Sequence, residues 1–312
     1  MILRKIIVTG STGLLGKYIL KNIIKNFENC DIYILKRDFS IYQVTKENNL
    51  IKINTLNFDS NCFLVNCAGE YVNKINMYSA NVDFPLKLIE FCLKNSINNF
   101  IHMSSVGSFG AGRYQGKVNE DTQYLSPKNL YEETKAEADA LLDKKRDANI
   151  KIVIIMPSNV VFSSERSSEA LLNFYRLFDK FLPQSKGASG WLNFIDVDAV
   201  AACISGVIKG EINHKKIILN NPLSYEECVN ITKSVTKKKA NIKEFPHLFL
   251  KLTYWAFSLL KKIGIKKSDL ILRRVYEMDN NLYFKTKFKD VQSISNKYGF
   301  KYIMSNVHRF NK

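Results

Sequence analysis

The sequence predicts an α/β protein, with a doubly wound parallel sheet and a smaller, mostly helical C-terminal part. Short β-branched runs alternate with amphipathic stretches along the first two thirds of the chain, and the first run ends in a glycine-rich loop. The chain has 312 residues, of which 46% are hydrophobic, enough for a large core. No Pro- or Ser-rich linker divides it.

The predicted elements alternate in the order of such a sheet. The expected strands are 5–8, 31–35, 62–66, 99–103 and 151–155, and the chain returns to the sheet near 216–219. The expected helices are 12–27, 81–96 and 127–148.

A glycine-rich loop follows the first predicted strand. Lys5-Ile6-Ile7-Val8 leads into Thr9-Gly10-Ser11-Thr12-Gly13-Leu14-Leu15-Gly16 and then into a helical pattern. We expect Gly10 to make the turn, Gly13 to allow close approach of a ligand and Gly16 to let the helix pack tightly on the strand. This order predicts a Rossmann-type site, where backbone N–H groups and a helix N-terminus hold a pyrophosphate.

The second strand ends in Lys36-Arg37, about twenty residues after the loop, where such sites bind the ribose. An acidic residue there would hold a ribose 2′-hydroxyl, whereas two cations suit a 2′-phosphate. NADP is therefore the expected cofactor. Asp38 follows directly and keeps NAD open, and a solvated surface pair is the other interpretation of Lys36-Arg37.

The segment Tyr131-Glu132-Glu133-Thr134-Lys135 sets a phenol and an ammonium one helical turn apart. A lysine in that place can stabilise a tyrosinate and lower the tyrosine pKa, which suits the phenol to proton transfer near neutral pH. The spacing alone also fits a partly exposed tyrosine beside a solvated lysine. The surrounding motifs must distinguish the two.

Further motifs follow in order along the chain. They are Asn66-Cys67-Ala68-Gly69, Asn81-Val82, Met103-Ser104-Ser105-Val106-Gly107-Ser108-Phe109-Gly110, Met156-Pro157-Ser158-Asn159-Val160 and Phe194-Ile195-Asp196-Val197-Asp198-Ala199-Val200-Ala201. Together with the glycine loop and the Tyr131–Lys135 pair, they resemble the extended short-chain dehydrogenase/reductase family, also called the NAD-dependent epimerase/dehydratase family. The resemblance covers about residues 1–230, with a weaker echo at Lys297-Tyr298-Gly299-Phe300.

The resemblance implies an enzyme that moves a hydride between a nicotinamide cofactor and a C–OH or C=O centre. Tyr131 would move the proton, and Ser105 would hydrogen-bond the reacting oxygen. Lys135 would hold the nicotinamide ribose and depress the Tyr131 pKa. Ser104 is the other candidate for the hydroxyl role, but the spacing between Ser105 and Phe109-Gly110 matches the family motif and favours Ser105. The expected catalytic residues are therefore Ser105, Tyr131 and Lys135.

The loop and the resemblance together imply a larger set of binding residues. The expected cofactor-binding residues are Gly10, Thr12, Gly13, Leu14, Leu15, Gly16, Lys36, Arg37, Cys67, Ala68, Gly69, Asn81, Tyr131, Lys135 and Pro157, and the expected substrate-binding residues are Ser105 and Asn159. Asn81 is equally an N-cap candidate, since it precedes an apolar run. We expect residues 1–160, with 194–220 returning to them, to form the NAD(P)-binding domain, and 161–193 with 221–312 to form the substrate-binding part.

Departures from the family pattern bear on the substrate. Nucleotide-sugar members often carry Arg before the proline and Tyr-Gly-Pro after it, whereas this chain has Met156 and Val161-Phe162-Ser163; Ala199 replaces the second Asp of V-D-D-V. The first hypothesis is a nucleotide-sugar 4-epimerase or 4-keto reductase. The second is a reductase or dehydrogenase of a hydrophobic alcohol or ketone, like hydroxysteroid dehydrogenases or dihydroflavonol reductases. The third is a non-catalytic NADP-binding regulatory protein, against which the intact catalytic set argues.

Charge and composition bear on partners. The net charge of +17 could indicate nucleic acid or an anionic membrane, but basic residues are spread along the whole chain, so no nucleic-acid partner is expected. The apolar segment from Leu248 to Leu260, bordered by Lys261-Lys262, is too short to span a bilayer. It is expected to cover the cleft, to pack on the core, or to make peripheral contact with a membrane surface.

Six cysteines and four histidines show no metal-ligand spacing, so no metal site is expected and the cysteines are interpreted as reduced core residues. His102 ends a strand and is expected in the core or at its rim. The first predicted strand begins almost at Met1, so no signal peptide is expected before it. We expect a cytoplasmic homodimer that acts on a small-molecule substrate.

Overall fold

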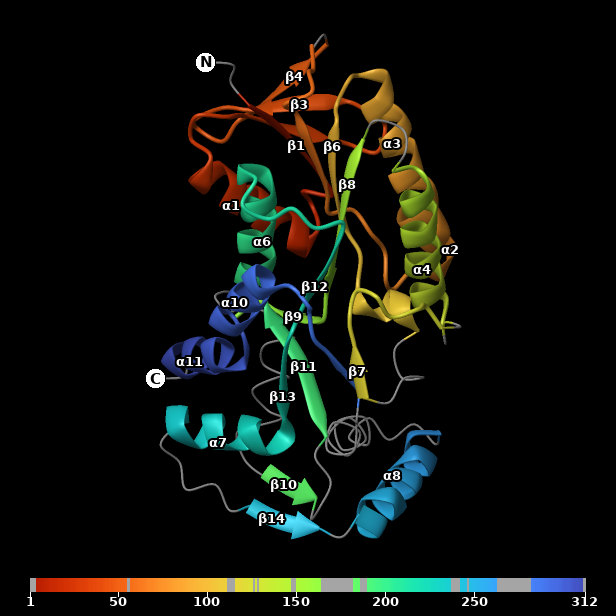
Figure 1. The fold of residues 1–312 in the computed structure, drawn as a ribbon, viewed down its shortest axis with the longest axis vertical. Helices are drawn as coiled ribbons and strands as arrows, with labels where there is room; N and C mark the ends of the chain where they lie inside the picture. The colour runs from red at the N-terminus through yellow and green to blue at the C-terminus, as the bar shows by residue number, and fades with distance from the viewer. Residues whose placement is uncertain are drawn as a thin grey trace.

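The computed structural model describes residues 4–54, 57–110, 116–125, 127, 129–146, 150–163, 182–185, 190–236, 242–245, 247–262 and 282–310. Its centre is an eight-stranded sheet in the order β12-β8-β6-β5-β1-β2-β3-β4 (Figure 1). Six of these strands are parallel: β1 (Lys5–Thr9), β2 (Asp31–Leu35), β5 (Phe63–Asn66), β6 (Asn99–Met103), β8 (Lys151–Pro157) and β12 (Lys216–Leu219). The predicted strands and the fold class are confirmed.

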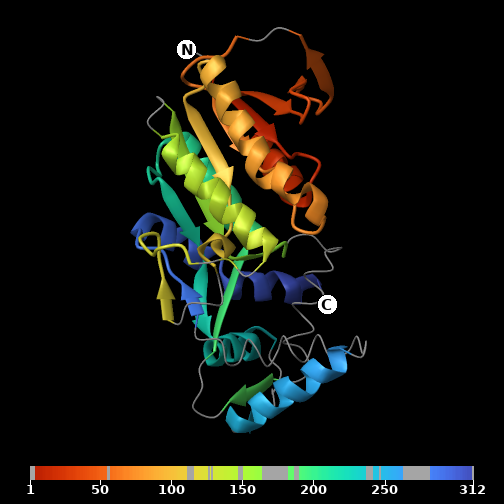
Figure 2. The ribbon, with the colours of Figure 1, turned by 90° about the vertical axis from the view of Figure 1, so that its right-hand side faces the viewer.

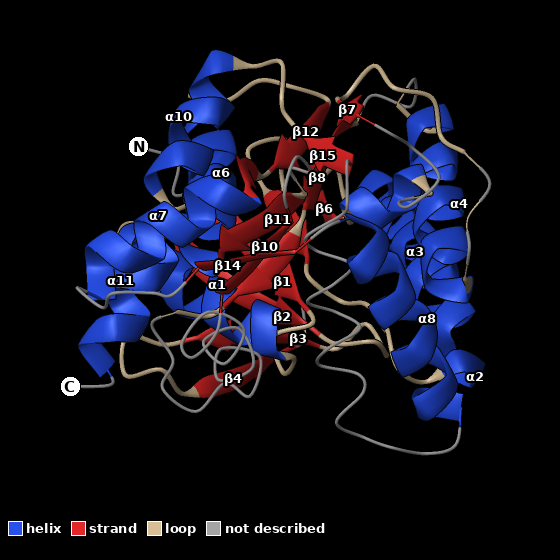
Figure 3. Ribbon diagram, turned by 90° about the horizontal axis from the view of Figure 1, so that it is seen from below, coloured by secondary structure: helices blue, strands red, loops and turns tan. Residues whose placement is uncertain are grey.

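Helices cover both faces of the sheet (Figure 3). α1 (Leu14–Asn26) and α6 (Val197–Lys209) pack together on one face, and α3 (Phe84–Lys94) and α4 (Leu130–Lys144) lie side by side on the other (Figure 2). Because both faces are covered, the central strands are continuous apolar runs, as in Ile6, Ile7 and Val8, which are fully buried. Two apolar clusters, one on each side of the sheet, form the core.

The sheet ends in an antiparallel hairpin that the sequence analysis did not predict. β3 (Ile41–Val44) and β4 (Leu50–Ile53) follow β2 in place of a helix and a further parallel strand. The hairpin turns at Thr45 to Asn49, where Asn48 adopts a left-handed conformation with a φ of 63°. The connection from β2 to the next strand of the sheet is therefore a short turn and not a helix.

The C-terminal part is helical with small added sheets. Its helices are α7 (Tyr225–Thr236), α8 (His247–Lys262), α10 (Lys289–Lys297) and α11 (Phe300–Phe310). β9 (Asn159–Val161), β11 (Trp191–Asp196) and β13 (Asn221–Ser224) form a three-stranded sheet, and two pairs complete the set: β7 (Gly116–Val118) with β15 (Leu282–Phe284), and β10 (Leu182–Ser185) with β14 (Ile242–Phe245). The division into two domains stays a prediction. Helix α10, which belongs to the predicted substrate-binding part, packs against α6 and β12 of the predicted cofactor-binding domain.

The topology reverses between β1 and β5. From β1 the chain builds outward to β2 on one side, and β5, β6, β8 and β12 follow on the other. In open α/β sheets this switch point opens a crevice at the carboxyl ends of the strands, where ligands bind. Three turns meet there: the glycine loop after β1, the segment 67–73 after β5 and the segment 104–110 after β6.

Candidate active site

The glycine loop is shaped by contacts that exclude side chains. Gly10 has a φ of 70°, and a Cβ there would lie 2.6 Å from the carbonyl carbon of Cys67. A Cβ on Gly16 would lie 2.6 Å from the carbonyl carbon of Gly10, so the helix packs directly on the turn. The predicted turn at Gly10 and the close packing at Gly16 are both present in the structure.

The same loop leaves the start of α1 open. Gly13 is the N-cap of α1, no side chain caps the helix, and its first turn holds no acidic residue. A Cβ on Gly13 would meet only the Gly10 carbonyl, at 3.4 Å. Thr12 and Leu14 are exposed beside it, and Leu15 is half-buried. Unpaired backbone N–H groups and the positive end of the helix dipole fit a pyrophosphate here.

A buried polar network fixes the loops on either side of the switch point. The Asn66 side-chain carbonyl accepts hydrogen bonds from the Thr9 hydroxyl at 2.7 Å and from the Ala68 N–H at 3.1 Å, and its amide lies 3.1 Å from His102 Nδ1. Burial holds the pKa of His102 well below its usual range, so the ring is neutral. His102 therefore supports the site from the core.

The two cations after β2 are exposed at the same edge. The Lys36 ammonium lies 4.2 Å from the centre of the Tyr42 ring. Backbone N–H groups of Val72, Asn73 and Tyr71 lower the pKa of Glu70, which lies in the loop after β5, and the charge of Arg37 adds to this effect. Asp38 is turned back into its own bend, where it accepts hydrogen bonds from the N–H and the hydroxyl of Ser40 at 3.1 and 2.6 Å. The carboxylate that kept NAD open is thus engaged by Ser40.

Asn81 ties the β5 loop to α4. Its side chain accepts from the Glu70 N–H at 2.9 Å and donates to the Glu70 carbonyl at 2.8 Å and to the Thr134 hydroxyl at 3.0 Å. It lies inside the π-helical turn η1 (Ser79–Asp83), a feature often found at functional sites, whereas Asn73 caps the helix α2 (Lys74–Tyr78). The N-cap interpretation of Asn81 is wrong.

Gly69 places the loop after β5 against Lys135. A Cβ on Gly69 would lie 3.3 Å from Asn81 Oδ1 and 3.5 Å from Lys135 Nζ. Gly69 follows the Cys67-Ala68 backbone that Gly10 approaches. The glycine loop, the β5 loop and α4 therefore form one continuous wall.

Ser105, Tyr131 and Lys135 come together at the end of β6. Asn129 caps α4 by accepting from the Glu132 N–H at 2.9 Å, which places Tyr131 in the first turn of that helix. The Ser105 hydroxyl lies near the Tyr131 ring and acts to lower the phenol pKa, and the Lys135 ammonium donates to the Met103 carbonyl at 3.0 Å. Gly107 is a further site residue that the sequence analysis did not assign, since a Cβ there would approach Ser105 Oγ at 3.4 Å and the Tyr131 ring at 3.7 Å.

Ser104 has a different partner from Ser105. Its hydroxyl donates to Asp139 Oδ2 at 2.7 Å, and both residues are buried. Ser105 is therefore the hydroxyl directed at Tyr131, as its spacing predicts. Asp139 lies one turn beyond Lys135 on α4 and was not assigned by the sequence analysis.

The electrostatics of the site differ from the expected depression of the tyrosine pKa. Burial raises the pKa of Tyr131, a hydrogen bond with Ser105 opposes this, and the Asp139 charge adds to the rise. Burial lowers the pKa of Lys135 to about 8, which Asp139 opposes, and burial raises the pKa of Asp139 to about 6. The expected depression of the Tyr131 pKa by Lys135 is not found: burial of the phenol raises this pKa, and Lys135 is not among the groups that shift it.

Pro157 and Asn159, the two predicted site residues near the end of β8, differ in their exposure. Pro157 is the buried last residue of β8, two positions beyond Ile155, which pairs with Met103 of β6. Asn159 is exposed, and its amide donates to the Asn193 carbonyl at 2.9 Å. The Asn159 amide nitrogen is thus held by the protein, and its oxygen is the atom available to a ligand.

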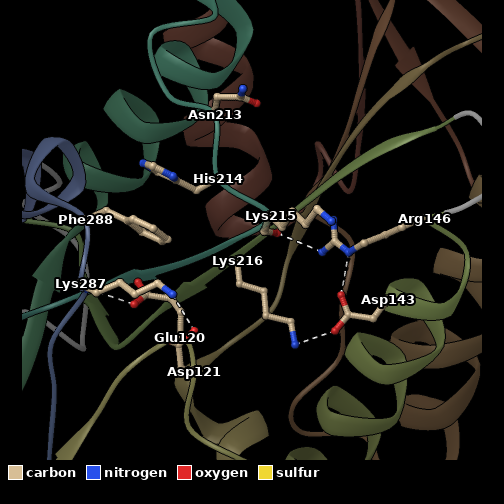
Figure 4. Close-up of a pocket in the computed structure, with 10 residues that line it drawn as sticks. All are labelled: Glu120, Asp121, Asp143, Arg146, Asn213, His214, Lys215, Lys216, Lys287 and Phe288. Carbon is tan, nitrogen blue, oxygen red and sulfur yellow. Dashed lines mark hydrogen bonds and ion pairs between the residues drawn. The ribbon is translucent and has the colours of Figure 1, made fainter.

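A hollow of about 490 Å³ lies at the other end of α4 (Figure 4). Lys216 and Arg146 are both directed at the Asp143 carboxylate, at 2.5 and 2.8 Å, and Lys287 pairs with Asp121 at 2.6 Å. Lys216 and Arg146 share the single Asp143 carboxylate, so the wall of this hollow is an ion-pair network, and the Lys216–Asp143 pair fastens α4 to β12 at the edge of the sheet.

The cradle at α1, the loop at Gly69 and the Ser105–Tyr131–Lys135 set lie on one edge of a doubly wound sheet. A bound dinucleotide would be held at its phosphates by the glycine loop and near Lys135 at its reactive end. These features define a dinucleotide-binding enzyme that couples hydride transfer to proton transfer.

Comparison with known proteins identifies the family. The model of the NAD dependent epimerase/dehydratase family matches residues 6–208, and the chain belongs to this family of enzymes. A relative described as an uncharacterized UDP-glucose epimerase, YtcB of Bacillus subtilis, is 29% identical over 254 residues, which are 73% of this chain and 76% of the relative.

Solved structures share the fold over nearly the whole chain. A short-chain dehydrogenase/reductase superfamily protein from Agrobacterium tumefaciens with bound NAD has a TM-score of 0.64 at 12% identity, covering 99% of this chain and 97% of that one. The UDP-N-acetylglucosamine 4-epimerase of Bacillus cereus has a TM-score of 0.63 at 15% identity, covering 98% of each chain. Other structures of this fold were determined with NAD or with NADPH. The confirmed family implies a nicotinamide cofactor.

Proposed function

We propose that this enzyme is an NADP-preferring 4-epimerase or 4-keto reductase of a nucleotide sugar. The observation that carries the proposal is the contact of Ser105 with Tyr131, beside the buried Lys135, at the carboxyl edge of the sheet. The similarity to a relative described as a UDP-glucose epimerase supports the substrate class.

The residues present divide the chemistry among them. The bound nicotinamide would supply or accept the hydride. Since burial raises the pKa of Tyr131, its phenol is protonated at neutral pH and donates a proton to a substrate carbonyl oxygen; in the reverse direction the same oxygen accepts one. Ser105 would hydrogen-bond that substrate oxygen, and Lys135 would hold the cofactor ribose.

The departures from the nucleotide-sugar pattern lie at buried positions. Met156, Phe162, Ser163 and Ala199 are each at most 6% exposed. Phe162 packs on the Tyr18 ring, and Ser163 is hydrogen-bonded to Asp196 and Asn306. Side chains engaged inside the protein do not contact a substrate, so these substitutions do not argue against a nucleotide sugar. The apolar segment at α8 is then the only observation that still supports the alternative substrate, a hydrophobic alcohol or ketone.

A substrate screen tests the proposal. Purified protein with NADPH, NADP, NADH or NAD is offered UDP- and dTDP-sugars and their 4-keto forms, alongside sterol-like and aromatic ketones, and cofactor absorbance and C4 epimers are followed. Turnover of a nucleotide sugar is expected. Turnover of hydrophobic ketones alone would replace the proposal by its alternative.

The cofactor preference has its own test. Arg37 and Lys36 are expected to bind a 2′-phosphate, so NADPH should bind about tenfold or more tightly than NADH, and Arg37→Ala should weaken NADPH binding while leaving NADH binding unchanged. Equilibrium titration of cofactor fluorescence measures both constants, with the exposed Lys52→Ala as the control. Tighter binding of NADH to the unaltered protein would show the preference to be wrong.

A further inference from the structure

Helix α8 presents exposed apolar side chains at one end of the molecule, opposite the β3–β4 hairpin (Figures 1 and 2). Leu252, Trp255 and Leu259 are 57%, 65% and 44% exposed, and Tyr254 is 46% exposed. Leu252, Trp255 and Leu259 are spaced by three and four residues, so they form one stripe along the helix. A tryptophan is usually well buried, so this α8 stripe indicates a contact surface.

The sequence around α8 is strongly basic. Residues 233–267 contain ten lysines and one glutamate, so this stretch carries just over half of the net charge of +17. Within α8 itself there are three lysines and no acidic residue. The charge is therefore more concentrated here than the even spread expected from the whole chain.

The length of α8 excludes a crossing of the bilayer. Its 16 residues rise about 24 Å, whereas the hydrocarbon core is about 30 Å thick. No helix within the described part of the chain is long and apolar enough to cross a membrane. A helix with an apolar stripe, an aromatic residue and basic neighbours is the kind that lies in the membrane interface.

Charge also argues against a second copy of this chain as the occupant. A twofold contact through α8 would place the same helix on both sides, so its three lysines would face lysines with no acidic residue on either helix. An anionic lipid surface, in contrast, complements both the apolar stripe and the positive charge.

We propose that α8 docks the enzyme on an anionic membrane surface. Trp255 would lie at the headgroup level, with Leu252 and Leu259 entering the boundary of the acyl chains. The three lysines of α8 would be attracted to the anionic headgroups, and this attraction would weaken at high salt.

Vesicle binding tests the proposal with full-length protein. We expect co-sedimentation with vesicles of equimolar phosphatidylcholine and phosphatidylglycerol, and little with pure phosphatidylcholine. The chain has two tryptophans, Trp191 and Trp255, so a Trp191→Phe protein reports on Trp255 alone. Its emission should shift to the blue on addition of anionic vesicles, and the shift should be reversed by high salt.

Substitution identifies the surface. Trp255→Ala should weaken vesicle binding about tenfold or more, Trp255→Phe should restore part of it, and Ile75→Ala, which removes a side chain 91% exposed on α2, should leave it unchanged. Circular dichroism checks that each variant is folded. The proposal is overturned if the anionic vesicles neither sediment the protein nor shift Trp255, or if Trp255→Ala instead dissociates a dimer.

Discussion

Burial determines the chemistry of single residues in this site. Tyr131 is half-buried and Lys135 is buried, and this loss of solvation raises the pKa of the phenol and lowers the pKa of the ammonium to about 8. Asp139 acts on both in the same direction, since its negative charge raises each pKa. It accepts a hydrogen bond from Ser104 and affects the reaction only through its electrostatic effect on Tyr131 and Lys135, so we regard it as a positioning residue.

Asp139→Asn is expected to move the pH dependence of the reaction. Removing this charge lowers the Tyr131 pKa, so in the oxidation direction, which needs the phenolate, the rising alkaline limb of kcat/KM should move to lower pH. Asp143→Asn, four residues further along α4 and absent from the groups that act on Tyr131, should leave the limb in place. An unmoved limb in Asp139→Asn, with the protein folded, would contradict this role.

At the scale of elements, the site depends on how closely backbone segments approach. The turn after β1 touches the turn after β5, and α1 packs on the first of these, so neither Gly10 nor Gly16 has room for a Cβ. At its far end α4 is fastened to β8 and β12, where Arg146 donates to the carbonyls of Ile152 and Lys215. The helix that carries Tyr131 and Lys135 is thereby held at both ends.

Gly10→Ala should disable cofactor binding. Gly10 and Gly210 have φ values of 70° and 83°, so alanine at either costs about 1–2 kcal/mol in backbone strain. Only at Gly10 does the added Cβ also meet neighbouring backbone; at Gly210 nothing lies within 4 Å. Denaturant unfolding and NADPH titration should therefore show a larger loss of stability and lost binding for Gly10→Ala, with binding intact in Gly210→Ala. Equal behaviour of the two variants would disprove the close-approach role.

At the scale of the whole molecule, the sequence is most informative where the signal is local. The buried strands, the glycine loop and the Tyr131–Lys135 spacing are encoded in short segments, and the structure contains each. The hairpin of β3 and β4 was missed although two short runs flank the turn at Asn48, a hairpin signal. The role of Asp139 and the direction of the Tyr131 pKa could not be predicted. The pKa depends on burial in the folded chain, and Asp139 is held by Ser104, 35 residues away in the sequence.

The candidate active site, the hollow and the proposed membrane contact lie in different regions of the molecule. The switch point carries the candidate chemistry, the hollow at the far end of α4 is lined by ion pairs, and α8 lies at the opposite end from the β3–β4 hairpin. The proposed membrane contact thus uses a surface separate from the ion-pair network.

The most direct test of the central claim is the turnover of Tyr131→Phe on the substrate that the screen identifies. This change removes only the phenolic oxygen, so turnover should fall about 10²–10⁴-fold, whereas NADPH binding, to which Tyr131 is one of many expected contributors, should weaken far less. That result would assign proton transfer to Tyr131. Full turnover by Tyr131→Phe would contradict the assignment and the proposed chemistry of the site.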